Sequence, residues 1–166
     1  MKRQEVLNEI KITFSNLKSA IAKFSEEDLN RVPFEGSWTA GQITQHIIIC
    51  ASGIPDEKTK PADRPYDEKI KSIRDMFLDM EIKFKTAPIL EPENPPHSRN
   101  ELTDTLNKLE DQHTASAQNL DMEALCLDME LPTFGHLTRY EWIRFMMVHT
   151  QRHTKQIENI YNKLKG

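Results

Sequence analysis

Residue types typical of secreted, membrane-spanning and disulfide-stabilised proteins are scarce in this sequence. Its two cysteines, Cys50 and Cys126, are too few for a disulfide framework, and they form no Cys-x-x-Cys zinc motif. The longest apolar run covers residues 47–51, far short of the roughly 20 residues that span a bilayer. The first residues are charged, and no apolar segment of a signal peptide follows them. We therefore expect a cytoplasmic protein with no membrane partner.

An excess of positive charge is also absent. The chain has 22 lysines and arginines against 26 aspartates and glutamates, a net charge of -4. Because duplex binding depends on a basic patch, this balance argues against a nucleic-acid partner. Glycine is scarce too, at five residues, and few segments alternate β-branched and polar residues, so helices are favoured. The length of 166 residues suits one domain, residues 1–166.

Helical periodicity is the main signal that is present. Four segments carry apolar residues every three or four positions, which is typical of helices with one buried face: residues 7–24, 43–52, 102–120 and 138–165. Residues 66–84 show the same spacing and predict an additional helix outside or alongside the others. Prolines and charges in the connections predict loops too long for simple hairpins. The fold class is therefore expected to be all-α.

Helix starts are marked by capping residues. Thr39 and Gln42 have the spacing of a capping box, and Trp38 and Ile43 occupy the two positions of a hydrophobic staple. Residues 98–101 predict a second capping box. These signals place the beginnings of the second and third long helices.

Two histidines, His149 and His153, interrupt the apolar stripe of the last helix where Leu or Ile would be expected. Residues four apart on a helix share a face, with roughly 5–6 Å between their Cβ atoms. Two imidazoles at this spacing can converge on one metal ion. From spacing alone, a metal-binding pair and two hydrogen-bonded core histidines both remain open.

A third histidine, His46, lies on the apolar face of the second long helix. Three imidazole ligands would leave a coordination position open for water or substrate, the arrangement of a catalytic metal site. Imidazole suits zinc, nickel and iron, so the residue types do not determine the metal. A metalloprotease is excluded, because the glutamate of its H-E-x-x-H motif is replaced by Thr150.

Other residues near these histidines have two interpretations each. His113 could be a fourth ligand or a base, although a packed interface histidine is favoured. Cys50, one turn after His46, could face the metal, although a small buried residue is favoured. His97 and His136 are expected in exposed loops.

Metal-bound histidines usually donate their second ring N–H to a nearby acceptor. Gln156, Gln45 and Glu141 lie close enough in the sequence to the three histidines to serve as that acceptor. The sequence does not choose among them.

Taken together, these residues resemble the DinB-like superfamily, and within it the YfiT-like branch of metal-dependent hydrolases. The resemblance covers nearly the whole chain. It is carried by residues 37–46, 66–69, 135–142 and 149–153, which include the tryptophan-led segment before His46 and the H-x-x-x-H pair.

The resemblance implies a four-helix bundle with a long crossover between its second and third helices. It also implies one divalent metal ion, nickel or zinc, held by His46, His149 and His153, and a homodimer. Characterised relatives include transferases that use a low-molecular-weight thiol such as bacillithiol or mycothiol as cosubstrate, while many others have no assigned substrate.

Two classes of function follow. The first is a metal-dependent enzyme that activates a thiol cosubstrate, as an S-transferase, or water, as a hydrolase, against a small molecule. The alternative is a non-catalytic stress-response bundle that binds a metal or ligand, since no Glu or Asp stands obviously beside the histidines. A purely structural bundle is the third possibility.

Overall fold

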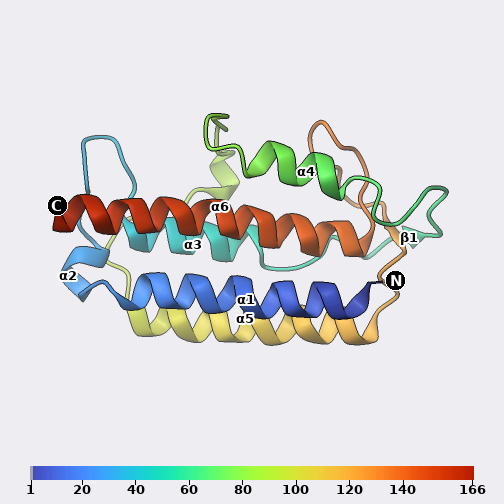
Figure 1. Cartoon of the computed structure of the whole chain (residues 1–166), viewed down its shortest axis with the longest axis horizontal. Helices are drawn as coiled ribbons and strands as arrows, with labels where there is room; N and C mark the ends of the chain where they lie inside the picture. The colour runs from blue at the N-terminus through green and yellow to red at the C-terminus, as the bar shows by residue number, and fades with distance from the viewer. Residues whose placement is uncertain (1) are drawn as a thin grey trace.

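The computed structural model describes residues 2–166, so only residue 1 of the expected domain lies outside it. The described chain is mostly helical (Figure 1). Its helices are α1 (Arg3–Ala22), α2 (Glu26–Leu29), α3 (Ala40–Cys50), α4 (Ile70–Phe77), the 3-10 helix η1 (Pro88–Leu90), α5 (Arg99–Asn119) and α6 (Arg139–Lys165). Two short strands, β1 (Thr59–Lys60) and β2 (Leu125–Cys126), pair antiparallel.

The four long helices form the predicted four-helix bundle. Helix α1 packs against α5 and α6, and α3 packs against the same two helices. The connection from α3 to α5 is the expected long crossover, and it carries α4, which packs on the outside of α6 (Figure 1). Within residues 2–166, none of the helices combines the length and apolar character that a membrane span requires.

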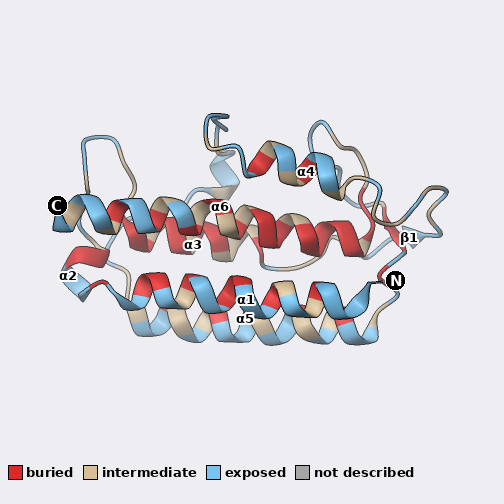
Figure 2. Ribbon diagram, viewed as in Figure 1, coloured by how far each residue is buried: buried red, intermediate tan, exposed pale blue. Residues whose placement is uncertain are grey.

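The core lies where the apolar stripes of these helices meet (Figure 2). On α1, Val6, Ile10, Phe14 and Leu17 are all fully buried, with the three- and four-residue steps of one helix face. Burying each such side chain stabilises the fold by about 1.5–3 kcal/mol. The same stripe on α3 and α6 turns their histidines inward.

The predicted helix starts are formed, with one difference. Thr39 accepts a hydrogen bond from Gln42 N, and the Gln42 side chain accepts one from Thr39 N, both at 3.0 Å. At the start of α5, the Ser98 side chain accepts from Glu101 N at 3.3 Å, but the described residues lack the return bond. The second capping box is therefore only half formed.

The prediction of a helix over residues 66–84 is wrong in extent, because α4 spans only eight residues, Ile70–Phe77. Arg152 of α6 donates to the carbonyl oxygens of Phe77 and Asp79 at 3.1 and 2.9 Å. The chain turns there, and Phe84 stacks on Phe77 with ring centroids 4.7 Å apart. The apolar spacing of this segment therefore reflects aromatic packing in a loop as well as one short helix.

Candidate metal centre

Packing of α3 against α6 brings the three predicted histidines together. The ring centroid of His46 lies 5.2 Å from that of His149 and 4.8 Å from that of His153. The two α6 rings lie 4.4 Å apart. The cluster therefore combines side chains that are about 100 positions apart in the sequence.

The nitrogen atoms of the α6 pair have the separation of two ligands of one ion. The Nε2 atoms of His149 and His153 lie 3.1 Å apart. Two imidazole nitrogens each 2.0–2.1 Å from a tetrahedral ion would be about 3.3 Å apart. Only a small movement of these two side chains would let both bind the same ion.

Hydrogen bonds from the Nδ1 atoms of two rings leave their Nε2 atoms without a proton. His46 Nδ1 lies 2.8 Å from the carbonyl oxygen of Leu90, and His153 Nδ1 lies 2.7 Å from Oε1 of Gln156. Both oxygens are acceptors, so each Nδ1 carries the proton and donates it. The lone pair of each neutral ring is then on Nε2, the tautomer required for binding a metal through that atom.

Burial keeps the three imidazoles neutral. It lowers the pKa of His46, lowers that of His149 well below its usual range, and brings that of His153 to about 4. Repulsion between the neighbouring imidazoles adds to the effect on His149 and His153. Neutral imidazole is the form that binds a metal, so the cluster has the protonation state of a ligand set at neutral pH.

The cluster has aromatic neighbours and is partly exposed. His46 is only 4% exposed, whereas His149 and His153 are half-buried. The ring of Trp38 lies 5.2 Å from that of His46, and the ring of Phe145 lies 5.8 Å from that of His149. The α6 pair is therefore partly accessible, and aromatic rings contact His46 and His149.

Cys50 of α3 also reaches the cluster. Its Sγ lies 3.7 Å from Nε2 and 3.8 Å from Nδ1 of His46. The ligand atoms of His46, Cys50 and His149 all lie within 4.8 Å of one another, so these three residues could hold a metal ion. Burial raises the pKa of the Cys50 thiol to about 11. The interpretation of Cys50 as only a small buried residue is therefore incomplete.

Of the candidate acceptors, Gln156 alone contacts one of the three histidines. Gln45 lies 2.9 Å from His97 Nε2 instead. Glu141 is fully buried. Its carboxylate takes part in the capping box of α6 and pairs with Arg64, and it forms no hydrogen bond to the three imidazoles of the cluster. The sequence could not identify the correct acceptor among the three, because nearness in the sequence does not show which side chain contacts a histidine in the fold.

His113 belongs to the core, as favoured from the sequence. It is fully buried, its ring stacks on Phe14 at 6.2 Å, and its Nε2 lies 2.7 Å from the carbonyl oxygen of Ala51. His97 and His136 lie in loops, as expected, but both are half-buried and not fully exposed. His97 packs against Gly41, where an added Cβ would come within 3.1 Å of the His97 Cβ.

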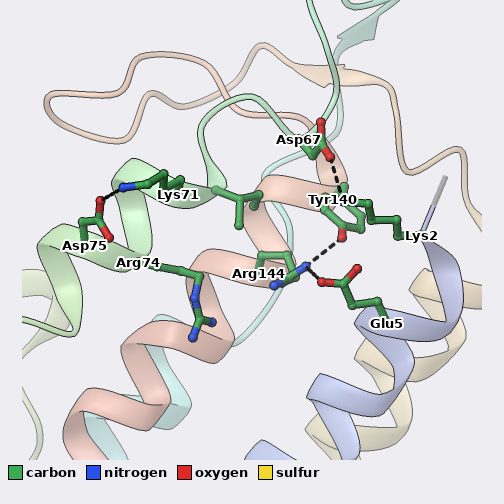
Figure 3. A pocket seen from close by; sticks show the side chains of 9 residues that line it. Lys2, Glu5, Asp67, Lys71, Arg74, Asp75, Tyr140 and Arg144 are labelled. Carbon is green, nitrogen blue, oxygen red and sulfur yellow. Dashed lines mark hydrogen bonds and ion pairs between the residues drawn. The ribbon is translucent and has the colours of Figure 1, made fainter.

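A separate cavity of about 420 Å³ lies between α1, α4 and α6 (Figure 3). Its charges are largely paired with one another. Arg144 contacts Glu5 at 3.3 Å and the Tyr140 hydroxyl at 2.7 Å, and Lys71 contacts Asp75 at 2.6 Å (Figure 3). No histidine or cysteine of the described chain lines it. The histidine cluster is therefore the better candidate for chemistry.

Comparison with known proteins identifies the family and the fold of this chain. A family model described as the DinB superfamily matches residues 9–157. The uncharacterized protein YuaE of Bacillus subtilis (strain 168) is 27% identical over 164 residues, covering 96% of this chain and 98% of that protein. The solved structure of YfiT from Bacillus subtilis, described as a probable metal-dependent hydrolase with an unusual four-helix bundle topology, superposes with a TM-score of 0.64. That match covers 99% of this chain and 88% of the other at 17% identity, so it shows a shared fold.

Proposed function

Because this chain belongs to the DinB superfamily, we propose that it is a metal-dependent enzyme acting on a small molecule. One divalent ion, nickel or zinc, would be held by His46, His149 and His153. The observation that carries the proposal is the 3.1 Å separation of the His149 and His153 Nε2 atoms beside a third neutral imidazole. When bound, the ion would act as a Lewis acid and lower the pKa of a water or thiol at its open position.

The chain's own residues hold the ligands in place for this role. The Leu90 carbonyl and the Gln156 amide oxygen orient His46 and His153 through their Nδ1 atoms. Such acceptors determine the tautomer and the ring orientation of a ligating histidine. The ring of Trp38 contacts His46 and the ring of Phe145 contacts His149, and apolar surroundings of this kind strengthen electrostatic interactions.

Two reactions would use the same open position. In the hydrolase form, activated water attacks the substrate, and the description of YfiT supports this form. In the transferase form, the thiolate of a low-molecular-weight thiol such as bacillithiol or mycothiol attacks an electrophilic carbon. No carboxylate within residues 2–166 is seen to hydrogen-bond to the three histidines, and a thiol with a lowered pKa needs no general base. That observation favours the transferase form.

The alternative function is a non-catalytic bundle that binds a metal or ligand in a stress response. The missing carboxylate supports this alternative as well, because many metal-dependent hydrolases position a general acid or base beside the metal. A screen of thiol cosubstrates against electrophiles, and of esters and amides without thiol, would separate the functions. Turnover in one set assigns the reaction, whereas silence in both sets favours the binding bundle.

The direct test of the metal site is the metal content of the purified protein and two variants. We expect about one divalent ion per chain in the wild type, and its loss in His149→Ala. His136→Ala is the matched control, because His136 is a half-buried histidine whose Nε2 lies 3.6 Å from a carboxylate oxygen of Glu130, outside the cluster. Helix content by circular dichroism checks folding. Unchanged metal content in His149→Ala would overturn the three-histidine site.

A homodimer stays a prediction from the family resemblance, since a single chain does not test it. Sedimentation velocity of the metal-loaded protein would measure its mass directly. A monomer at micromolar concentration would contradict the prediction without affecting the metal site.

A further inference from the structure

Each of the two helices at the cluster presents a pair of candidate ligands one turn apart. Helix α6 contributes His149 and His153, and α3 contributes His46 and Cys50 at the same i, i+4 spacing. The two pairs face each other, because His46 contacts both α6 rings. The site is therefore built from a His-x-x-x-Cys segment opposite a His-x-x-x-His segment.

We propose that Cys50 is a fourth protein ligand, which binds the ion through its thiolate sulfur beside the three histidines. This inference rests on the metal site proposed above. A sulfur about 2.3 Å and a nitrogen 2.0–2.1 Å from one tetrahedral ion would be about 3.6 Å apart. The Sγ of Cys50 lies 3.7 Å from Nε2 of His46 and 3.8 Å from Nδ1, so it lies against the face of the ring and would have to turn toward the Nε2 side to share an ion with it. The ligand atoms of His46, Cys50 and His149 already lie within 4.8 Å of one another.

The second cysteine shows how a purely structural cysteine differs in this chain. Cys126 is fully buried and belongs to the hydrophobic core. Cys50 is half-buried and is not part of that core, and its sulfur contacts the imidazole ring of His46, 3.7 Å from Nε2 and 3.8 Å from Nδ1. Cys50 therefore contacts the imidazole cluster and, unlike Cys126, is not part of the hydrophobic core.

A thiolate ligand would change the chemistry of the site. On binding, the S–H bond breaks, the electron pair stays on sulfur and the proton passes to solvent. Four protein ligands close a tetrahedral shell, so a substrate or cosubstrate would have to displace one of them or expand the coordination. Cys50 is the ligand that an incoming thiol can replace with the same donor atom. Sulfur also favours zinc over the harder ions magnesium and manganese.

Cobalt(II) substitution tests the proposal without any enzymatic assay. The metal-free protein would be titrated with Co²⁺ alone, and its absorption would be recorded in the near-ultraviolet and the visible. We expect a sulfur-to-cobalt charge-transfer band together with the visible bands of a four-coordinate ion. Cys50→Ser should lose the charge-transfer band and keep visible cobalt bands. Cys126→Ala, the matched control, should keep both.

The outcomes separate this proposal from the metal site itself. Visible cobalt bands without a charge-transfer band in the wild type would overturn the Cys50 ligand and leave the three-histidine site standing. A charge-transfer band that survives in Cys50→Ser would also overturn it. Absence of cobalt binding by the folded wild type would overturn both. In Cys50→Ala, a small added thiol should restore the band, and failure of that rescue at saturating thiol would contradict an exchangeable sulfur position.

Discussion

Oε1 of Gln156 lies 2.7 Å from Nδ1 of His153, one helical turn along α6. This contact determines which nitrogen of the His153 ring carries the proton and leaves Nε2 facing His149. It thus links an ordinary polar side chain to the geometry of the candidate metal centre.

Replacing Gln156 by Leu should weaken metal binding without unfolding the protein. Loss of an acceptor behind a ligating histidine typically lowers metal affinity about 10- to 100-fold. Competition with a chromophoric chelator would measure the change. Gln156→Glu should retain most of the affinity, because the carboxylate accepts the same hydrogen bond. The exposed neighbour Lys155 provides the control Lys155→Ala, and an equal loss in that variant would argue against the orienting role.

The ion pair of Arg64 with Glu141 should be essential for stability. The two guanidinium nitrogens of Arg64 each lie 2.8 Å from a carboxylate oxygen of Glu141, which is fully buried. Arg64→Met leaves this carboxylate buried without its counter-ion, so the free energy of unfolding should fall by about 3–5 kcal/mol in urea titrations.

Two further variants show whether the buried charge causes that loss. Adding Glu141→Gln to Arg64→Met should recover part of the stability, because no uncompensated charge remains. Lys71→Met breaks a pair with Asp75 in which both side chains are exposed, and it should change stability by less than about 1 kcal/mol. Equal losses in Arg64→Met and Lys71→Met would contradict the prediction.

His113 should make stability depend on pH. Burial lowers its pKa in the folded state, although its hydrogen bond to Ala51 opposes this shift. Below about pH 6.5 the unfolded chain binds a proton that the folded chain resists, so stability falls as pH falls. One such proton corresponds to about 1.4 kcal/mol per pH unit.

Urea unfolding between pH 5 and pH 8 would measure this dependence. His113→Gln should show a shallower dependence than the wild type below about pH 6.5, by up to one proton. A chelator present in all samples keeps the contribution of the metal cluster equal. His136→Gln, on a half-buried loop histidine, is the control. Identical slopes in the wild type and His113→Gln would exclude His113 as the source.

Arg152 should stabilise the folded conformation of the loop after α4. Its guanidinium donates to the carbonyl oxygens of Phe77, Asp79 and Ile82 and lies 4.8 Å from the Phe84 ring. Lysine keeps the positive charge, but its single ammonium group cannot reproduce the planar arrangement of N–H donors that reaches these three carbonyl oxygens. Hydrogen bonds from charged groups contribute about 1.5–3 kcal/mol, so Arg152→Lys should speed amide exchange in residues 78–84 at least about tenfold. Unchanged exchange there, measured by mass spectrometry, would contradict the anchoring role.

Local sequence signals were sufficient for the long helices and for the inward direction of the histidines. The stripe of α1 and the box of Thr39 and Gln42 depend on contacts within a few residues, so they can be predicted without the fold. The helix predicted over residues 66–84 was too long, because only part of the apolar spacing belongs to α4. The rest comes from Phe84, which stacks on Phe77 from the loop. Glu141 stood among three candidate acceptors, because its actual partner, Arg64, lies 77 positions away and no local pattern links the two.

Apolar spacing is enough to predict which side chains point toward the bundle interior, because a helix turns about 100° per residue and the spacing marks one face. Which of these interior side chains meet depends on how the helices pack against one another. The packing of α3 on α6 placed His46 and Cys50 opposite His149, and the packing of α1 on α5 placed His113 beside Phe14. Helix adjacency results from the packing of the whole chain, and no local pattern encodes it.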